Sequence, residues 1–406
     1  MTQVMIDNLG VMTSPAIKAS VLTDDEAFET LGAEWDDLLD HSDQRAFFLR
    51  WAWSQLWWRT FRPPHSHLFI ILCRDSQGRL TGLAPLYWKQ RRTAGIRHLR
   101  ELHFLGTGIY AQTSEYLDVV ARRGYERAVA DAVAGFLRRD PDWDRLCLTE
   151  VPADSTVLPL LQQALGEAAQ ITGCNRSYYV DTSTDWETFT TRLTKSAREN
   201  IFRRRRRIFK TFESEFRLVD SAGELEPAMD ALVRLHQARW QTKGEPGAFA
   251  LNGAEQLLRE AARFAFRDGR LRLWTLSLNK KVAAALLGFV DNGVLHAFQS
   301  GFDPAYTHIG LGGVMNGLCI SASVEDKVVD YYDFMGGIDA YKQSWTKTSW
   351  DSVSMTWLRP GRHSQTFKII EQATRLGKAL VRKIVPKPIK VAAHKFIMKR
   401  RYYSEK

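Results

Sequence analysis

The order of elements predicted between residues 270 and 359 constrains the fold more than any other feature. Three strand-like stretches come in quick succession and are joined by "NK" and "NG" turns of the tight-hairpin kind. They are "RLRLWTLSL", "KVAAALLGFVD" and "GVLHAFQSGFD". A glycine-rich helix start, a strand, a short helix and a last strand follow, in "HIGLGGVMNGLCISASVED", "VVDYYDFMGG", "DAYKQSW" and "DSVSMTWLR". This order predicts a mixed, mostly antiparallel sheet flanked by helices, which is an α/β (α+β) fold.

The first half of the chain repeats this plan in pattern, although not in residue identity. Helical patterns come first, then strands and a turn, then a helix from Glu126 to Arg139 and the strand "DRLCLTEV". A chain of 406 residues is also too long for one ordinary domain. We therefore predict two copies of one α/β unit. The predicted divisions are a flexible tail over 1–18, a first domain over 19–180, a second over 181–358 and a basic amphipathic segment over 359–406.

The formal charge of +10 is concentrated in two places. Residues 195–210 contain eight basic residues and one acid, and residues 374–406 contain eleven basic residues and one acid. The rest of the chain carries a net charge of about −7 by subtraction. A mildly acidic body with local basic segments argues against a protein that coats nucleic acid with its whole surface.

Other compositional features indicate an ordinary protein of a reducing compartment. The four cysteines are scattered without CxxC spacing, which favours buried thiols over a disulfide framework or a catalytic role. No signal peptide is recognised, and the longest apolar run, "VAAALLGFV", is far shorter than a membrane span. We expect a cytoplasmic protein, at most peripheral to the inner face of the membrane. No metal-ligand cluster, GxSxG elbow or Walker loop is present, so no metal is expected.

The glycine-rich stretch "THIGLGG" is the first candidate binding site. Glycines at a helix N-terminus let backbone N–H groups approach an anion, and the helix dipole favours negative charge there. Following three antiparallel strands, Gly310, Leu311, Gly312 and Gly313 are suited to hold a pyrophosphate. The alternative is a purely structural turn.

Seven segments between residues 47 and 345 carry a resemblance to a known family. They are "FFLRWAWSQLWWRTF", "GRLTGLAPLYW", "LHFLGTGIYAQTSEYLD", "RENIFRRRRRIF", "LVRLHQARW", "HAFQSGFDPAY" and "YYDFMGGIDAYKQSW". With them the chain resembles GNAT-superfamily acyltransferases of the BioF-like or CelD-like group, related to the FemAB peptidyltransferases. The resemblance implies tandem GNAT-like domains. It also implies transfer of an acyl group from a thioester, usually acetyl-CoA or another acyl-CoA, to an amine or hydroxyl.

The resemblance also suggests roles for individual residues. Gly310 and Gly312 fall on the glycine positions of the family's pyrophosphate loop, whereas Thr307 stands where the family has Gln or Arg. Tyr341 matches the general acid that protonates the departing thiolate, and packing is its alternative role. Lys342 beside it is a candidate to stabilise an oxyanion or grip an anionic substrate, with a surface lysine as the alternative.

The general base is sought among acids at strand ends. Asp303 ends a strand near the expected cleft, Asp333 lies on the strand before the Tyr341 helix, and Asp118 occupies a comparable place in the first half, where we expect substrate binding. Such acids also commonly cap turns, and water can relay the proton instead. His236 and His296 are further candidates.

The arginine run, Arg203 to Arg207, lies on a predicted helix. Ile201, Ile208, Phe209 and Phe212 recur on one helical face, and Arg204 and Arg205 fall on that same face. Arginines on a buried stripe require partners, which are acids of the body, an anionic acceptor or donor, or nucleic acid. We expect Arg204 and Arg205 to contact either buried acids or the substrate.

Three functional interpretations remain open at this stage. The first is an N- or O-acyltransferase acting on an envelope, polysaccharide or amino-acid-type precursor. The second is a FemAB-type ligase that uses aminoacyl-tRNA and holds RNA phosphates with its basic segments. The third is a non-catalytic accessory protein that binds an anionic polymer. The C-terminal segment mixes basic and apolar residues, which suits an anionic membrane surface or a solvated tail.

Overall fold

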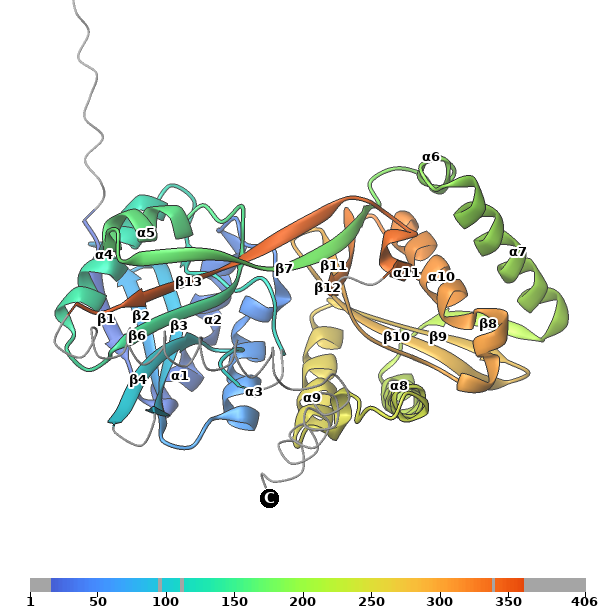
Figure 1. Cartoon of the computed structure of the whole chain (residues 1–406), viewed down its shortest axis with the longest axis horizontal. Coiled ribbons are helices and arrows are strands. Elements are labelled where there is room, and N and C mark those ends of the chain that lie inside the picture. Colours follow the sequence, from blue (N-terminus) through green and yellow to red (C-terminus); the bar gives the residue numbers. More distant parts are fainter. Residues whose placement is uncertain (1–15, 94–96, 110–112, 338–339, 361–406) are drawn as a thin grey trace, which may run out of the picture.

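The computed structural model describes residues 16–93, 97–109, 113–337 and 340–360. Its strands form one 13-stranded sheet in the order β1-β2-β3-β4-β6-β13-β7-β12-β11-β10-β9-β8, with the short β5 paired to β3 (Figure 1). Ten of these strand pairs are antiparallel, and two, β4 with β6 and β11 with β12, are parallel. The predicted α/β fold with a mixed, mostly antiparallel sheet is confirmed.

The elements have the following bounds. The strands are β1 Lys18–Leu22, β2 Ser66–Arg74, β3 Leu80–Thr93, β4 Arg97–Phe104, β5 Val120–Ala121, β6 Arg145–Pro152, β7 Ala169–Asp181, β8 Ser214–Leu218, β9 Leu271–Leu278, β10 Lys281–Asp291, β11 Val294–Phe302, β12 Tyr331–Gly336 and β13 Ser349–Leu358. The α-helices are α1 Asp25–Thr30, α2 Gly32–Asp40, α3 Trp51–Phe61, α4 Glu126–Arg139, α5 Leu158–Leu165, α6 Trp186–Thr191, α7 Lys195–Thr211, α8 Ala222–Thr242, α9 Ala254–Arg267, α10 Leu311–Glu325 and α11 Ala340–Gln343. Three short 3-10 helices are η1 Phe47–Leu49, η2 Ala248–Ala250 and η3 Pro304–Ile309.

The two halves of the chain share one topology. In residues 16–168, here the first half, four antiparallel strands β1 to β4 are followed by α4 and by β6, which returns parallel to β4. In residues 182–348, the second half, β8 to β11 are followed by α10 and by β12, which returns parallel to β11. Each parallel contact spans only three residue pairs.

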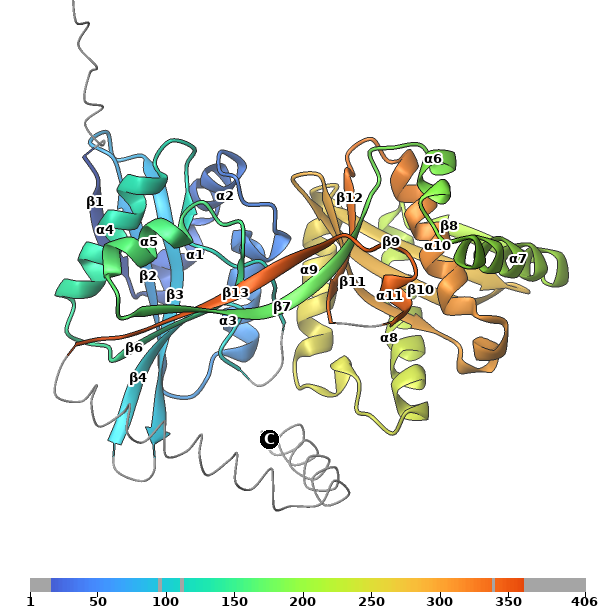
Figure 2. The same ribbon diagram turned by 45° about the horizontal axis from the view of Figure 1, so that its top comes forward.

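The strand that follows each half completes the sheet of the other half. β7 follows the first half but pairs with β12, and β13 follows the second half but pairs with β6. The two strands also pair with each other, from Ala169–Tyr178 against Trp357–Ser349. Figure 2 shows both strands running from one half into the other. The predicted division near residue 180 therefore stays a prediction, because these two strands hold both halves in one sheet.

The apolar run of β10 is explained by burial on both faces. Ala285, Leu287 and Phe289 belong to the larger core cluster, which includes residues of α8 and α9. Ala284 and Leu286, which point the other way, belong to the second cluster with α10. Figure 1 shows α8 and α10 on opposite faces of this part of the sheet.

An aromatic cluster joins the cores of the two halves. Phe47 of η1 stacks on Phe289 of β10 with ring centroids 4.2 Å apart, and Trp53 of α3 packs edge-on against Phe289 and Phe298. Trp53 is 1% exposed, and its indole Nε1 donates to the Ser114 hydroxyl at 2.8 Å. Burial of large aromatic surfaces stabilises this contact, and the tryptophan-rich pattern of α3 is its sequence signature.

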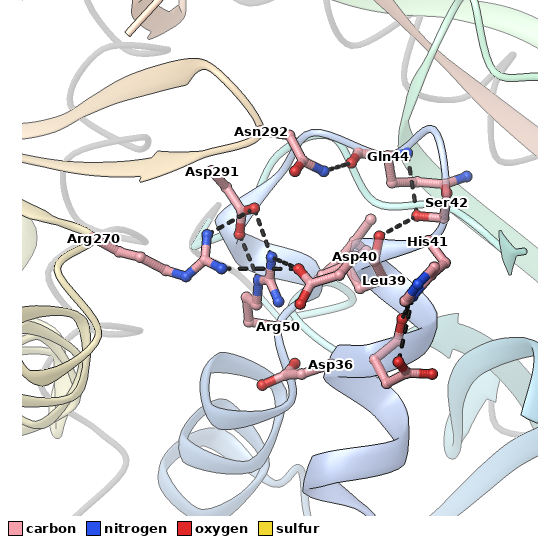
Figure 3. A network of polar contacts seen from close by, with 12 residues as sticks. Asp36, Leu39, Asp40, His41, Ser42, Gln44, Arg50, Arg270, Asp291 and Asn292 are labelled. Carbon is pink, nitrogen blue, oxygen red and sulfur yellow. Dashed lines mark hydrogen bonds and ion pairs between the residues drawn. The ribbon is translucent and has the colours of Figure 1, made fainter. Parts of the chain in front are cut away.

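A buried ion-pair network also joins the two halves, at the boundary that we call the seam (Figure 3). Arg50 donates from Nε to Asp291 at 2.6 Å and from Nη2 to both Asp291, at 2.8 Å, and Asp40, at 2.5 Å. Arg270 adds a bond to Asp291 at 3.1 Å. Burial disfavours the charge of Arg50, but the hydrogen bonds and charges of Asp291 and Asp40 outweigh it, so the pKa of Arg50 is raised.

Some predicted segments lie outside the described residues. These are most of the 1–18 tail and nearly all of the 359–406 segment, so flexibility and membrane contact stay predictions. Among the described residues no helix has the length and apolar content to cross a bilayer. Likewise, in this part of the chain no group of three or more His, Cys, Asp or Glu side chains is placed to hold a metal ion.

Candidate functional site

A cleft of about 450 Å³ opens beside the glycine loop, which we define as Gly310–Gly313. We call it the glycine-loop cleft. Its walls come from α7, α8, β10, β11, the start of α10 and α11 with the residues after it. The lining residues are Ala197, Asn200, Ile201, Arg204, Arg239, Leu286, Ser300, Gly301, Phe302, Thr307, Gly310, Leu311, Gly312, Gly313, Met315, Asn316, Tyr341, Ser344 and Trp345.

The cleft lies where two parallel strands separate. β11 pairs with β12 only from Val294 to His296, against Tyr331 to Asp333. Beyond this point β11 continues to Phe302, and its last three residues line the cleft. The first residues of α10 line the same cleft as this free end of β11.

The glycine loop presents backbone rather than side chains to the cleft. Gly310 adopts the left-handed conformation, with φ 73° and ψ 35°, and caps α10 without a side chain. The N–H groups of Gly313 and Val314 are bonded to the Gly310 carbonyl, whereas those of Leu311 and Gly312 have no backbone acceptor among the described residues. The first turn of α10 carries no acid. These features favour an anion at the helix N-terminus.

The three glycines of the loop differ in what a side chain would meet. A Cβ atom at Gly310 would lie 2.8 Å from Nη1 of Arg204, and one at Gly312 would lie 3.0 Å from the ring of Phe302. At Gly313 a Cβ would have no heavy atom within 4 Å. Of these three glycines, Gly313 is therefore the one at which a larger side chain would reach open space and disturb the packing least.

Two arginines give the cleft a positive wall. Arg204 of α7 covers Gly310, and Arg239 of α8 lies over the Phe302 ring at 5.1 Å. No Asp, Glu or His is among the described residues that line this cleft. Its charge is therefore suited to an anionic ligand such as a phosphate ester.

The family comparison covers this half of the chain. Residues 195–343 match the model of the acetyltransferase (GNAT) domain family. The matched segment contains α7, the glycine loop and Tyr341. The second half is GNAT-like. No curated protein sequence matches the chain significantly.

Solved structures resemble the chain over most of its length. FemX is 9% identical, covers 84% of this chain and 97% of its own, and gives a TM-score of 0.55. A conserved protein of unknown function from Bacteroides thetaiotaomicron is 12% identical, with 83% and 100% covered and a TM-score of 0.51. The C-terminal domain of a putative lysylphosphatidylglycerol synthetase from Agrobacterium fabrum is 8% identical, with 85% and 96% covered and a TM-score of 0.50. At these identities the likeness concerns the fold.

The equivalent helix of the first half lacks the features of the glycine loop. α4 begins after Tyr125 and carries Glu126 in its first turn. The Glu126 carboxylate accepts from the Gly124 N–H at 2.9 Å, so the first turn of α4 carries a negative side chain of its own, unlike that of α10. The GNAT-like half is thus the better candidate for donor binding.

Tyr341 and Lys342, adjacent in sequence, have different surroundings. Tyr341 is 44% exposed, lines the cleft and packs edge-on against Phe334. Lys342 is 4% exposed, and its ammonium donates to the carbonyls of Met335 at 2.8 Å and Gly336 at 2.6 Å. Lys342 is thus buried rather than on the surface. Its two bonds hold the end of β12, and a contact with ligand stays a prediction.

The arginine run is placed on α7, as predicted, but the expected buried acids are absent. Ile208 is fully buried in the second core cluster, whereas Phe209 of the same predicted face is 40% exposed, so the apolar face of the helix is confirmed only in part. Within the described residues Arg204 and Arg205 form no ion pair, and Arg205 lies over the ring of Phe209 at 5.9 Å. Internal ion pairing was therefore wrong for both, because Arg204 lies at the cleft and Arg205 lies against the ring of Phe209.

Two further candidates have structural partners. The Asp303 carboxylate accepts from the Ala305 N–H at 3.0 Å and caps η3, outside the residues lining the cleft. His236 is 3% exposed, donates from Nδ1 to the Ser300 carbonyl at 3.1 Å and accepts at Nε2 from the Ala248 N–H at 3.1 Å. Burial lowers the pKa of His236 to about 4, so the ring is neutral at pH 7.

A second cavity lies at the seam between the halves, and we call it the seam cavity. Its volume is about 430 Å³. It is lined by Asp43, Gln44, Arg45, Tyr116, Asp118, Pro152, Asp154, Ser155, Thr156, Val294, His296 and Trp350. The predicted substrate residue Asp118 lies here, 2% exposed, and burial raises its pKa to about 7.

Asp333 lies behind this cavity rather than in the cleft. It is fully buried and accepts from the Met335 N–H at 2.9 Å, and its Oδ2 is 3.2 Å from Nδ1 of His296. Nε2 of His296 is 3.0 Å from the Arg45 carbonyl. A carbonyl oxygen only accepts, so this contact requires a proton on Nε2. Asp333 on one side and the Arg45 carbonyl on the other hold the imidazole in its orientation.

The predicted residues thus fall into three groups. Gly310, Leu311, Gly312, Gly313, Arg204 and Tyr341 meet in the glycine-loop cleft, and Asp118 lies in the seam cavity. Asp303, Asp333, Arg205 and Lys342 line neither space. Sequence reasoning missed Arg239 and Gln44 as site residues. Arg239 could have been predicted, because it lies three residues after the candidate His236 on the same helical face. Gln44 lies in a loop, where no periodic pattern indicates it.

Proposed function

We propose that this chain is an acyltransferase that binds an acyl-CoA donor in the glycine-loop cleft. The acyl group passes to an amine or hydroxyl of an envelope, polysaccharide or amino-acid-type precursor. The observation that carries the proposal is the α10 N-terminus, where the N–H groups of Leu311 and Gly312 and the open space at Gly313 face a cleft with arginines on its wall. Such a site is suited to the pyrophosphate of coenzyme A.

Tyr341 is the proposed general acid of the reaction. It lines the same cleft as the glycine loop, and a phenol there is suited to protonate the coenzyme A thiolate as the thioester breaks. The acceptor loses its proton during attack, and no carboxylate or imidazole among the described lining residues is placed to take it. We therefore propose a water relay, and Asp303 and Asp333 stay predicted bases outside the cleft.

The donor site is tested by calorimetric titration of acetyl-CoA. We expect the unmodified protein to bind and Gly313→Val to bind at least about tenfold more weakly, because the valine fills the open space at the loop. Gly173→Val is the matched control, since Gly173 of β7 also has no neighbour within 4 Å of a Cβ and lies outside the cleft. Equal affinity in all three proteins would contradict the donor site.

The aminoacyl-tRNA ligase is the second candidate, favoured by the outer face of α7. Arg203, Arg206, Arg207 and Lys210 are exposed there, beside the Arg204 edge of the cleft. If these residues hold RNA phosphates, tRNA affinity should fall steeply with salt, with a slope that alanine substitution of Arg206 and Arg207 reduces. Binding of acetyl-CoA without tRNA binding would favour the acyl-CoA donor, and binding of neither would favour an accessory protein.

A further inference from the structure

Acids outnumber bases among the described residues that line the seam cavity. Three carboxylates, those of Asp43, Asp118 and Asp154, line it against the single guanidinium of Arg45. Asp43, at the rim, pairs with Arg123 at 2.8 Å. Asp118 lies deeper and is 2% exposed.

Asp118 lacks the cation that a buried carboxylate normally has. Its Oδ1 accepts from the Val119 N–H at 2.8 Å, and its Oδ2 is approached by Nε2 of Gln44 at 3.4 Å. Among the described residues it forms no ion pair. A buried carboxylate without a positive partner is costly to ionise, which agrees with its raised pKa.

Gln44 provides a second unused group in the same cavity. Gln44 is only 8% exposed. Its amide Nε2 lies 3.4 Å from each of two acceptors, Oδ2 of Asp118 and the Val119 carbonyl. These contacts fix the orientation of the amide. The remaining Oε1 atom is buried without a hydrogen-bond partner in the described structure. A hydrogen-bond donor brought into the cavity, from a ligand or from water, would satisfy this atom.

Aromatic rings form the apolar part of the wall. Tyr116 and Trp350 both line the cavity and meet edge to face, with centroids 6.2 Å apart and an interplanar angle of 90°. Aromatic faces attract organic cations and cover their methylene groups. A bare metal ion fits less well, because no group of three metal-ligating side chains is found in the described residues.

We infer that the seam cavity binds the ammonium or guanidinium end of a small organic molecule. Asp118 accepts hydrogen bonds from the cation, Oε1 of Gln44 accepts another, and Tyr116 and Trp350 cover the adjoining carbons. Binding of the cation is independent of the acyl donor. That the bound molecule is also the acyl acceptor rests on the proposed function.

The two sites contact one strand, which sets the size of such an acceptor. The seam cavity contacts His296 and the glycine-loop cleft contacts Ser300, four residues further along β11. At about 3.3 Å per residue this is ~13 Å. An acceptor held by its cationic end in the seam cavity therefore has to be extended to present its reacting group at the cleft.

The test compares three probes of equal length by saturation-transfer NMR titration. The probes are n-pentylammonium, 1-pentanol and pentanoate. We expect the unmodified protein to bind pentylammonium at least about tenfold more tightly than pentanol, and pentanoate most weakly, because a charge-assisted hydrogen bond distinguishes them. Asp118→Asn keeps the shape of the side chain and should weaken pentylammonium about tenfold or more. Gln44→Met should weaken it less.

Asp142→Asn is the matched control, since Asp142 is an exposed acid outside the cavity with a 73% exposed side chain. It should bind pentylammonium like the unmodified protein. Equal affinity for pentanol and pentylammonium, or unchanged affinity in both Asp118→Asn and Gln44→Met, would overturn the inference. Gly313→Val should retain pentylammonium binding, so failure of the donor site and failure of the cation site are read separately.

Discussion

The ion pair between Arg50 and Asp291 allows a quantitative test of the seam. The two side chains are 3% and 1% exposed and are joined by bonds of 2.6 and 2.8 Å. Removing one partner from a buried pair costs about 3–5 kcal/mol, because the other charge stays buried. Asp291→Ala leaves Arg50 bonded to Asp40, whose side chain is 49% exposed. We therefore expect the lower end of the range, about 3 kcal/mol.

The assay is urea unfolding followed by tryptophan fluorescence, with the free energy of unfolding taken from the midpoint and slope. Arg50→Met with Asp291→Leu should be less destabilised than Asp291→Ala, since it removes both buried charges and leaves Arg270 and Asp40, which are partly exposed and 3.8 Å apart. Asp142→Ala breaks only the exposed pair with Arg100 and should cost no more than about 1 kcal/mol. A loss below about 1 kcal/mol in Asp291→Ala would refute the buried pair.

Three further results are expected. Tyr341→Phe should keep acyl-CoA affinity in calorimetry while turnover, measured by thiol release with an acceptor present, falls by ~10²–10⁴-fold; unchanged turnover would remove the residue from the mechanism. Arg204→Ala should weaken acyl-CoA about tenfold with little loss of stability, whereas Arg207→Ala, exposed elsewhere on α7, should bind normally; equal affinities would exclude Arg204 from the donor site. His236 has a pKa of about 4 in the folded protein, below its unfolded value. Its contribution to stability is therefore complete above pH ~6.5 and is lost as pH falls towards 4, by up to about 3 kcal/mol. His236→Gln should lack this part of the pH dependence in urea titrations.

The hairpins and the glycine loop could be predicted from local patterns in the sequence. The turns at 279–280 and 292–293 place non-glycine residues and a glycine at positive φ, as tight hairpin turns require. The glycines before α10 were recognised because their conformational freedom and the helix dipole act over a few residues. These features depend on short stretches of chain, so a sequence shows them directly.

The joining strand β7 was missed for the opposite reason. Its sequence, "AQITGCNRSYYVD", has polar residues and a glycine at its centre and lacks clean alternation. It is a strand because β13 and β12 pair with it from distant parts of the chain. The predicted helix that carries the arginine run begins at Lys195, separately from α6, because Thr194 caps its start by accepting from the Ala197 N–H.

The arginine run shows the limit of periodicity. The predicted apolar face of α7 holds for Ile208 but not for the exposed Phe209, because periodicity does not say what lies opposite each residue. Ile208 meets the core and Arg204 meets the cleft only one turn away. Likewise the environment of Asp118 depends on Gln44, which is 74 residues away in sequence and in a different loop.

Amide hydrogen exchange with and without acetyl-CoA tests the central claim most directly, because it reports on the backbone N–H groups without requiring a known acceptor. The donor should slow exchange at Leu311 to Val314, at the start of α10, and leave the start of α4 at Glu126 unchanged. Protection at α4 instead, or protection at neither helix under conditions where calorimetry shows binding, would contradict a donor site at the glycine loop.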